Sequence, residues 1–560
     1  MRSFVVLLLS MSLMPGISPG LEAAATPGDR PAKDTKLGRS PVLARNGMIA
    51  TSQPLASAAG LRVLMEGGNA VDAAITAAAV LNVVEPMMCG IGGDLFALYY
   101  EADTGTLHGL NATGRAGAKA DAAKLRADGL TRMPGNGPLA VTVPGALDGW
   151  EELVSRFGTR PLGELLQPAI EHAEEGFPVS EVISVQWKQA ESRLARHPAT
   201  AAAYLVDGKR APEHGEVFRS PDFAKTLRRI AEQGTDVFYR GEIAEAIHDF
   251  MEEEGGFVTR DDLAAHDSTW VDPISTTYRG VEVFQIPPNS QGFVALEMLN
   301  ILEGYDDLTE LGHNSAAYLH RLIEAKKLAF ADRDAYLGDP EHMRVPVETL
   351  TSKRYADIRR AAIEPGRAAR EVAPGMTDDG DTIYLTVVDK DRNAISLIYS
   401  IFGSFGSGLV VPGTGIALQN RGTGFSLEEG HPNEMEPGKR ALHTNMPGMA
   451  FRDGKPWLSY GVMGGDMQPQ GHTQVLLNMI DFGMHVQKAG EMPRFRHSAS
   501  GVGIESGVDP DDLAALSRMG HSLVTRFGAY GGYQAIMIDW ENGVLLGGSD
   551  PRKDGAAMGY

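Results

Sequence analysis

The residue pattern changes character at Thr382, and this change limits the folds that the chain can adopt. Before it, helical stretches alternate with Gly and Pro breaks over residues 145–335, and few strands appear there. After it, "TIYLTVVD" and "AISLIYS" are β-branched or alternating and predict strands, with hairpin turns at residues 391–393 and 453–454. The helix-rich and strand-rich parts are too intermixed to be separate domains, so we expect α and β layers packed in one body.

The same patterns place individual elements. Helices are expected at residues 55–65, 71–84, 147–157, 161–175, 242–254, 294–302, 316–328 and 472–482. Further strands are expected at residues 409–420, at 448–461, and in "QAIMIDW" and "VLLGGSD" near the C-terminus. The segment "CGIGGDLFALYY" runs from a glycine turn into a strand. Its glycines match neither G-x-G-x-x-G nor a P-loop, so close backbone packing is favoured there over a nucleotide site.

Residues 1–25 have the pattern of a targeting segment. Arg2 precedes an apolar run from Phe4 to Leu13, and small residues end at Ala25. The run is too short to span a bilayer, so a removed secretory signal is favoured over a membrane anchor. Residues 26–44 are expected to be a flexible leader. We therefore expect a periplasmic or secreted protein without a membrane anchor.

Composition excludes several classes of function. The formal charge of −21 and the absence of a basic run argue against a nucleic-acid partner. Cys89 is the only cysteine, so an intrachain disulfide and a Cys-rich metal site are excluded. The 15 histidines lack ligand spacing, and H-E-x-x-H, G-x-S-x-G and C-x-x-C are absent. We expect neither a metal nor an organic cofactor.

Thr382 is a candidate nucleophile. The preceding "PGMTDDGD" is rich in Gly, Asp and Pro, which suits an exposed, cleavable loop. Scission of the Asp381–Thr382 bond would give Thr382 an α-amine of pKa about 8 beside its hydroxyl, and that amine is a competent general base. The alternative is that a β-branched threonine simply begins a strand. Pattern alone favours this alternative.

A resemblance changes that balance. The chain resembles the γ-glutamyltransferase family of N-terminal nucleophile hydrolases from about Met48 to Tyr560. The segments that carry the likeness include "SQPLASAAGLRVLMEGGNAVDAAI", "EPMMCGIGGDLFALYY", "YRGVEVFQIPPNSQG", "TIYLTVVDKDRNAISLIYS", "FGSFGSGLVVPGTGIALQN" and "GSDPRKDGAAMGY". The resemblance implies a four-layer αββα sandwich made as one precursor. It is expected to cut itself into a large subunit, residues 45–381, and a small subunit, residues 382–560.

The resemblance also implies roles for single residues. Thr382 stands at the position of the nucleophile, and Asp381 is the residue whose peptide bond is cut. Ser400 matches a second hydroxyl residue near the nucleophile's amine. Gly464 and Gly465 match the paired glycines whose N–H groups form the oxyanion hole, a role that small residues suit physically.

Departures from the family pattern bear on the substrate. Family members that bind γ-glutamyl groups use an Asp for the α-ammonium and an Arg for the carboxylate. These positions are Gly424 and Thr113 here, although Arg115 and Arg421 are further candidates for carboxylate binding. His443 and Thr444 replace a pair of small hydroxyl residues that contact the carboxylate.

The sequence thus predicts an autoprocessing threonine amidohydrolase or acyltransferase with a small-molecule amide substrate. Cleavage of γ-glutamyl amides such as glutathione is the activity that the family implies by default. The pocket residues favour an alternative, an acylase for glutaryl-like or oxamate-like amides that lack an α-amine. A hypothesis of another class is a non-catalytic binding protein that retains the fold. The joint presence of Thr382, Ser400, Gly464 and Gly465 argues against it.

Overall fold

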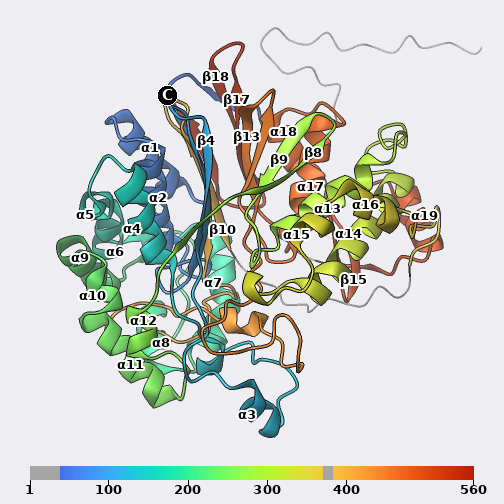
Figure 1. The fold of residues 1–560 in the computed structure, drawn as a ribbon. Coiled ribbons are helices and arrows are strands. Elements are labelled where there is room, and N and C mark those ends of the chain that lie inside the picture. The colour runs from blue at the N-terminus through green and yellow to red at the C-terminus, as the bar shows by residue number, and fades with distance from the viewer. Residues whose placement is uncertain (1–37, 370–381, 527) are drawn as a thin grey trace, which may run out of the picture. The chain divides into compact units, whose positions relative to one another are not determined.

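Two antiparallel sheets of seven strands each face one another at the centre of the structure (Figure 1). The computed structural model describes residues 38–369, 382–526 and 528–560. The predicted signal segment 1–25, most of the predicted leader and Asp381 lie outside these ranges. The chain divides into residues 1–39 and the compact unit Ser40–Tyr560.

The first sheet has the strand order β1-β18-β17-β13-β12-β9-β8, and the second has the order β19-β2-β10-β11-β3-β4-β7. The strands of the first sheet are β1 (Val42–Ala44), β8 (Ile274–Tyr278), β9 (Val281–Gln285), β12 (Gly448–Arg452), β13 (Lys455–Val462), β17 (Tyr533–Asp539) and β18 (Val544–Ser549). Those of the second are β2 (Met48–Thr51), β3 (Asp94–Glu101), β4 (Thr106–Ala112), β7 (Thr269–Val271), β10 (Ile383–Val388), β11 (Ala394–Ser400) and β19 (Ala556–Gly559).

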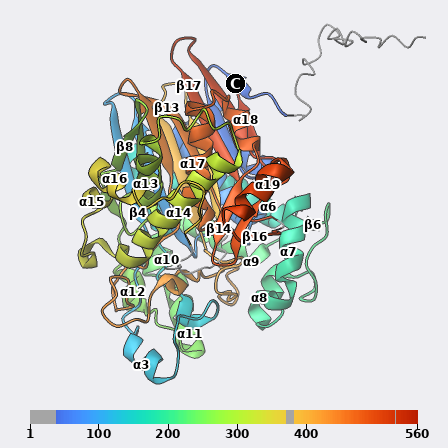
Figure 2. The same cartoon turned by 90° about the vertical axis from the view of Figure 1, so that its right-hand side faces the viewer.

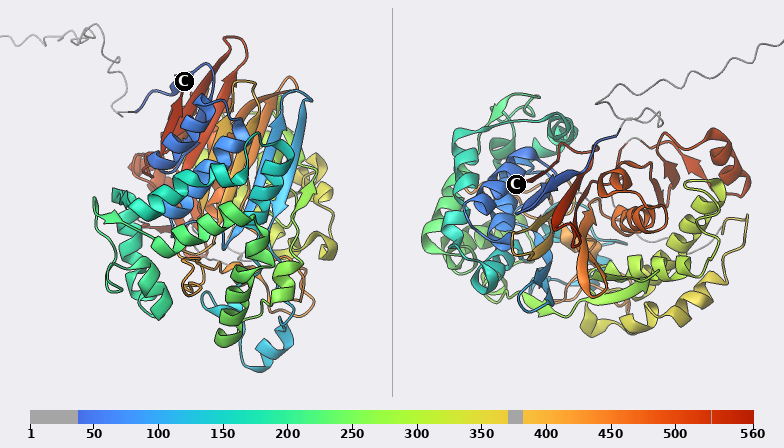
Figure 3. Two further views of the ribbon diagram at one scale, coloured as in Figure 1. Left: turned by 90° about the vertical axis from the view of Figure 1, so that its left-hand side faces the viewer. Right: turned by 90° about the horizontal axis from the view of Figure 1, so that it is seen from above.

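An apolar layer joins the inner faces of the two sheets. It contains Phe96 and Tyr384 from the second sheet and Met449 and Ile536 from the first, all completely buried. Helices cover both outer faces, as the view from above in Figure 3 shows. The result is the expected α+β sandwich of four layers, helix, sheet, sheet and helix.

The outer face of the second sheet is covered by a pair of apolar helices, α1 (Pro54–Met65) and α2 (Ala70–Val84). Every residue of α2 is buried, which matches its richness in Ala and Val. Asn69 begins α2 through a capping box in which its side chain accepts from the N–H of Asp72 and the Asp72 carboxylate accepts from the N–H of Asn69. The other helices of this part of the chain are α3 (Ala122–Ala127), α4 (Ala146–Phe157), α5 (Leu162–Leu165), α6 (Gln167–Glu175), α7 (Glu181–Leu194), α8 (Pro198–Tyr204), α9 (Pro221–Gln233), α10 (Asp236–Tyr239), α11 (Glu242–Glu254) and α12 (Arg260–Ala264).

The outer face of the first sheet is covered by α13 (Gly292–Glu303), α14 (Ala316–Tyr336), α17 (Met467–Ile480) and α18 (Val486–Glu491), seen from the front in Figure 2. A small sheet of β14 (Phe495–Ser498), β15 (Gly501–Ile504) and β16 (Leu523–Val524) lies beyond them, next to α19 (Pro510–Arg518). The remaining elements are α15 (Val347–Leu350), α16 (Lys353–Arg360), the strand pair β5 (Phe177–Pro178) and β6 (Val217–Phe218), and the 3₁₀ turns η1 (Pro138–Ala140), η2 (Pro340–His342) and η3 (Arg421–Gly424).

Segments from before and after Thr382 share both sheets. In the second sheet, the later strands β19, β10 and β11 lie among the earlier strands: β19 and β10 pair with β2, and β11 pairs with β3. In the first sheet, β1 pairs with β18 and β9 pairs with β12. The helix-rich and strand-rich parts of the sequence therefore form one structure, as expected from their intermixing.

Three sequence expectations need correction. Residues 409–420 do not form a strand; they turn back on themselves with one isolated bridge between Val410 and Ala417, because Gly413 and Gly415 adopt positive φ. The helix expected at residues 161–175 breaks into α5 and α6, since Pro168 has no N–H to continue the hydrogen-bond pattern. The leader was expected to run to residue 44, but residues 42–44 already form β1 and pair with β18.

None of the helices within the described residues combines the length and the apolar character that crossing a membrane requires.

Candidate active site

Thr382 lies at the start of a central strand. It immediately precedes β10, and the antiparallel register that pairs Ile383 with Tyr399 places it beside Ser400, the last residue of β11. Its hydroxyl Oγ1 donates toward Ser400 Oγ at 3.3 Å and toward Asn445 Oδ1 at 3.5 Å. Thr382 is 1% exposed, yet it lines a wide cavity. The structure thus brings the predicted nucleophile and the predicted second hydroxyl together.

Ser400 is held in place by the chain that follows it. Its Oγ accepts a hydrogen bond from the N–H of Phe402 at 2.8 Å. Because the strand ends at this residue, the turn that follows fixes the hydroxyl oxygen against Thr382. A serine hydroxyl can donate and accept hydrogen bonds at the same time, so Ser400 can help to orient the hydroxyl of Thr382.

The turn of Gly464 and Gly465 lies between β13 and α17. Their φ angles of +117° and +54° lie in the region that favours glycine. Neither N–H group donates a hydrogen bond to any residue that the structure describes. Gly464 lines the same cavity as Thr382. Two such backbone donors beside the hydroxyl of the predicted nucleophile are the arrangement that an oxyanion hole requires.

The residue that connects Thr382 to the predicted substrate pocket is Asn445, which sequence reasoning did not single out. Its neighbour Thr444 accepts a hydrogen bond at Oγ1 from Nη1 of Arg421, at 3.2 Å. The Arg421 guanidinium also stacks on the ring of Phe402, 4.1 Å from its centroid. Arg421 is therefore linked to the nucleophile twice, through the 444–445 peptide and through Phe402 and Ser400.

Three buried donor atoms of this group have no hydrogen-bond partner among the described residues: Arg421 Nε, Arg421 Nη2 and Asn445 Nδ2. Burial lowers the pKa of Arg421 to about 9, and nearby Asp94 opposes this shift, so the guanidinium is charged at neutral pH. Leaving buried donors unpaired costs about 1–3 kcal/mol each. A hydrogen-bond acceptor that reaches these atoms would satisfy them.

Asp94 supplies a carboxylate that sequence reasoning did not place in the pocket. Its Oδ2 lies 3.9 Å from Arg421 Nε and 3.3 Å from His443 Nε2. Its Oδ1 accepts from the N–H of Gly114 at 2.8 Å and from Gln419 Nε2 at 3.0 Å. Burial raises the Asp94 pKa to about 6, against the opposing effect of Arg421. The oxygens of Asp94 already have partners within the protein. The Asp94 carboxylate therefore partly neutralises the charge of Arg421.

His443, a predicted substrate contact, is assigned a different part by the structure. Its Nδ1 accepts from the N–H of Asn445 at 3.1 Å, and its Nε2 faces Asp94. Burial holds the His443 pKa well below its usual range, so the ring is neutral with its proton on Nε2. Both ring nitrogens are occupied within the protein. His443 therefore orients Asn445 and Asp94, and its contact with the substrate stays a prediction.

Two further predicted substrate residues, Gly424 and Arg115, do not hydrogen-bond to the group of Arg421, Asp94 and His443 among the described residues. Gly424 ends η3, the turn that Arg421 begins, and a Cβ atom there would lie 2.9 Å from the carbonyl oxygen of Leu442. Gly424 supplies no carboxylate to the pocket. Arg115 donates to the Gly438 carbonyl at 2.9 Å and lies 3.6 Å from Asp339, with 43% of its side chain exposed. Its part in substrate binding stays a prediction.

The cavity on the other side of Thr382 has a volume of about 1300 Å³. Its walls come from α7, from the small sheet and from residues 525, 526 and 528–531; Figure 2 labels α7 and the strands β14 and β16 of the small sheet. Aliphatic side chains of the small sheet and α19 form one part of the lining. Basic residues form another: Arg193, Arg496, Arg526, Arg552 and Lys553.

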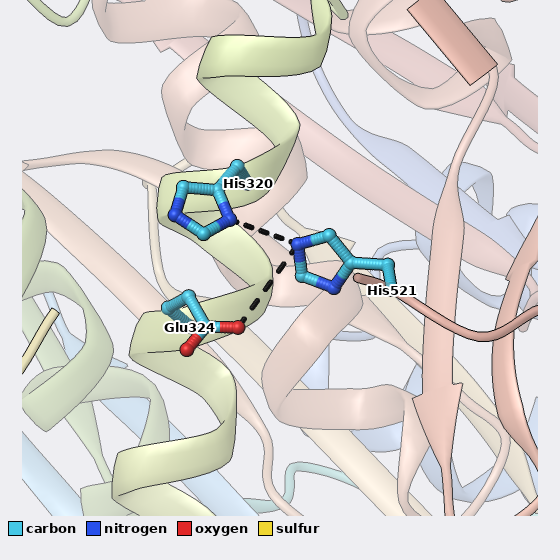
Figure 4. A group of neighbouring side chains, drawn as sticks. All are labelled: His320, Glu324 and His521. Atoms are coloured by element: carbon cyan, nitrogen blue, oxygen red, sulfur yellow. Dashed lines mark hydrogen bonds and ion pairs between the residues drawn. The ribbon is translucent and has the colours of Figure 1, made fainter. Parts of the chain in front are cut away.

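One further cluster of the described residues has a composition suited to a metal ion: His320 and Glu324 of α14, and His521 (Figure 4). His320 Nδ1 and His521 Nε2 are 2.8 Å apart, a hydrogen-bond distance, whereas two ligands of one tetrahedral zinc ion lie about 3.3 Å apart. Lys327 Nζ also donates to Glu324 at 2.6 Å. The cluster fits a hydrogen-bonded clamp, which holds Glu364 and Ala369 through their backbone atoms.

Comparisons with known proteins agree with this geometry. The profile of the family described as gamma-glutamyltranspeptidase matches residues 56–560. The chain belongs to this family.

Two curated relatives and one solved structure illustrate its position within the γ-glutamyltranspeptidase family. The glutathione hydrolase-like YwrD proenzyme of Bacillus subtilis is 41% identical over 92% of this chain and 99% of the relative. The acylase ACY 1 proenzyme of Pseudomonas sp. strain SE83 is 37% identical over 93% of this chain and 94% of the relative. A cephalosporin acylase from Bacillus halodurans superposes with a TM-score of 0.88 at 44% identity, covering 96% of this chain and 99% of that one.

The chain is therefore an enzyme of the γ-glutamyltranspeptidase family with the N-terminal nucleophile hydrolase fold. Its relatives are named as proenzymes, which agrees with one precursor giving two subunits.

Asn445 and Asp94 were missed in the sequence for different reasons. Asn445 follows His443-Thr444, and no local pattern distinguishes it from other polar residues of a loop. Asp94 directly follows Gly92-Gly93 and precedes the buried run of residues 95–100, and an acidic residue at such a position was a usable signal.

Proposed function

We propose that this enzyme cuts itself before Thr382 and then hydrolyses amides whose acyl group bears a carboxylate but no α-amine, such as glutaryl-like or oxamate-like amides. The observation that carries the proposal is Arg421. Two donor atoms of its buried guanidinium have no hydrogen-bond partner among the described residues, and the side chain is linked through Thr444 and Asn445 to the Thr382 hydroxyl. The acylase named among the relatives supports the same choice.

In the first step, Thr382 Oγ attacks the carbonyl carbon of Asp381. The C–N bond breaks, an ester forms on Oγ, and the α-amine of Thr382 takes up a proton. Water then hydrolyses the ester, which leaves a carboxyl on Asp381 and a free N-terminus on Thr382. The free amine is the general base for later rounds.

In turnover, the amine accepts the proton of Oγ as Oγ attacks the substrate carbonyl. The N–H groups of Gly464 and Gly465 stabilise the oxyanion, a contribution of about 3–4 kcal/mol to the barrier. The amine then protonates the leaving nitrogen as the C–N bond breaks. Water, activated by the same amine, releases the acyl group from Thr382.

The second candidate is γ-glutamyl hydrolysis or transfer, the activity in the names of several relatives. The one observation in its favour is the carboxylate of Asp94, 3.9 Å from Arg421. Its oxygens already accept from Gly114, Gln419 and His443, so an α-ammonium would have to displace one of these partners. We therefore place it second.

Two measurements test the proposal. Gel electrophoresis with mass analysis should show fragments of about 39 and 20 kDa, estimated at roughly 110 Da per residue, the smaller one beginning at Thr382. A comparison of glutaryl and γ-glutamyl p-nitroanilides should give a kcat/KM at least about tenfold higher for the glutaryl compound, because the γ-glutamyl ammonium loses a charge-assisted hydrogen bond. Equal or faster turnover of the γ-glutamyl compound would reverse the order of the two candidates.

Localisation outside the cytoplasm is also a proposal, supported by the pattern of residues 1–25 alone. Detection of the mature protein in a periplasmic or culture-medium fraction, with its first residue near 26, would test it.

A further inference from the structure

Gln291 is a completely buried side chain at the start of α13, outside the set of residues that the mechanism uses. Its Nε2 donates to the carbonyl oxygen of Thr444 at 2.8 Å and to that of Gly465 at 3.2 Å. Thr444 adjoins Asn445, which contacts the nucleophile, and Gly465 belongs to the oxyanion turn. One amide group thus ties together the two segments that flank Thr382.

The other end of the Gln291 amide is also fixed. Arg333 of α14 donates from Nη1 to Gln291 Oε1 at 2.8 Å and to Asp466 Oδ1 at 2.6 Å. Asp466 follows Gly465 and is the N-cap residue of α17. Arg333 is 2% exposed and Gln291 is 0% exposed, so water does not compete for these hydrogen bonds. The oxyanion turn is held from both sides of Gly465.

The turn needs such support because its own residues provide none. Gly464 and Gly465 have no side chains, and glycine is the residue with the widest backbone freedom. Oxyanion donors work only when they lie about 2.7–3.1 Å from the developing charge, and a displacement of about 1 Å costs roughly 100-fold in rate. Whatever fixes the carbonyl of Gly465 therefore fixes the neighbouring N–H groups.

We infer that Gln291 is a positioning residue, which sets the placement of the Gly464–Gly465 oxyanion hole relative to Thr382 and is itself held by Arg333. The inference rests on the proposed role of Thr382 as nucleophile. Since self-cleavage and substrate hydrolysis both pass through an oxyanion, Gln291 serves both reactions.

The first test is Gln291→Met, which keeps the volume and removes both donors. We expect kcat for the glutaryl anilide to fall about 10- to 100-fold with KM changed less than about twofold, and the rate of self-cleavage to fall by a similar factor. The matched control is Gln474→Met. Gln474 Nε2 likewise donates to two carbonyls, those of Gln470 and Phe495, away from Thr382. It should lower the melting temperature comparably and leave kcat within about twofold.

The second test is Gln291→Glu, which also keeps the inference testable if the methionine variant does not fold. An ionised carboxylate would face two carbonyl oxygens and no longer donate, so activity should be lowest at high pH. Arg333 favours the ionised form of this carboxyl, whereas burial and the nearby Asp466 carboxylate favour the protonated form. Protonation restores a donor, so activity should recover as pH falls. The wild type and the Gln474→Met control should not show that recovery.

The inference is overturned if Gln291→Met reduces kcat no more than Gln474→Met does, if it acts on KM alone, or if Gln291→Glu shows no recovery at low pH. The self-cleavage assay separates this result from a wrong substrate proposal, because it needs no added substrate. A wild type that cuts itself but spares glutaryl anilides refutes only the proposed substrate class. A wild type that never cuts at Thr382 refutes both.

Discussion

The two sides of Thr382 differ in how they are built. On one side, Arg421, Asp94 and His443 form a closed group of charged and polar side chains, none more than 1% exposed, with most partners assigned within the protein. On the other side lies a cavity of about 1300 Å³ with aliphatic and basic walls. A fixed charge in a buried site discriminates strongly because an unmatched group leaves it unpaired. A wide cavity of mixed lining discriminates weakly. The contrast predicts strict selection of the acyl group and tolerance of the leaving group.

The largest expected effect comes from Thr382, which belongs to both sides. Thr382→Ala should leave one uncut chain and lower hydrolysis of every substrate by at least about 10⁴-fold, since loss of a nucleophile removes the covalent route. Thr386→Val is the matched control, because Thr386 is buried on the same strand and hydrogen-bonds to Ser459 instead. Normal scission in the alanine variant, seen by gel electrophoresis, would show that the Thr382 hydroxyl is not the nucleophile. The two sides would then not share this residue.

Arg421→Met should separate the two sides. Loss of a charge-assisted hydrogen bond, about 1.5–3 kcal/mol, predicts a fall of roughly 10- to 150-fold in kcat/KM for glutaryl anilide. Butyryl anilide, which is uncharged, should change less than about threefold. The double variant with Asp94→Asn controls for the buried carboxylate left behind. Lys553→Met on the cavity side should change kcat/KM by the same factor for the glutaryl and the butyryl anilide. Equal losses on both anilides in Arg421→Met would contradict the division.

Gly424→Asp should shift acyl selection towards γ-glutamyl compounds. The new carboxylate can pair with an α-ammonium, and we expect the ratio of kcat/KM for γ-glutamyl over glutaryl anilide to rise about tenfold. The Cβ atom would lie 2.9 Å from the Leu442 carbonyl oxygen, so the local chain must shift. Gly424→Ala carries the same steric cost without the charge and should leave the ratio unchanged. A similar shift in both variants would assign the effect to backbone displacement.

The smallest effect concerns pH. The Asp94 pKa is raised to about 6, so below that pH Asp94 loses its charge and no longer neutralises Arg421. Attraction for a substrate carboxylate is then stronger. KM for glutaryl anilide should therefore rise about two- to threefold as pH increases from 5 to 7, and Asp94→Asn should abolish this dependence. Steady-state kinetics across the interval would decide, and a KM that falls with pH would assign the titration elsewhere.

Much of the framework was accessible from sequence, because local signals determine it. The helix at residues 71–84, now α2, and the Asp453-Gly454 turn depend on neighbouring residues and appear where expected. Close packing at the glycine cluster was also predicted. A Cβ at Gly92 would lie 2.1 Å from the Ala417 carbonyl oxygen, and one at Gly93 would lie 2.2 Å from that of Ser400.

The parts of the site that were missed depend on contacts between distant residues. Gln291 and Gly465 are 174 positions apart, and Asp94 and His443 are 349 apart, so no local pattern joins them. The placement of His443 shows the limit of reasoning from single positions. Its identity indicated a substrate contact, whereas its hydrogen bonds to Asp94 and Asn445 show that both nitrogens are already in use.

The alternation of strands in the second sheet, where β10 lies between β2 and β11 and β11 lies next to β3, bears on the lifetime of the enzyme. An intact precursor threads these strands into register as one molecule, whereas two separated fragments would have to recover the same order by bimolecular encounter. Once the chain is cut, heat inactivation should be irreversible. The half-life of the enzyme should then be set by the rate at which the sheets separate and not by an equilibrium free energy of unfolding.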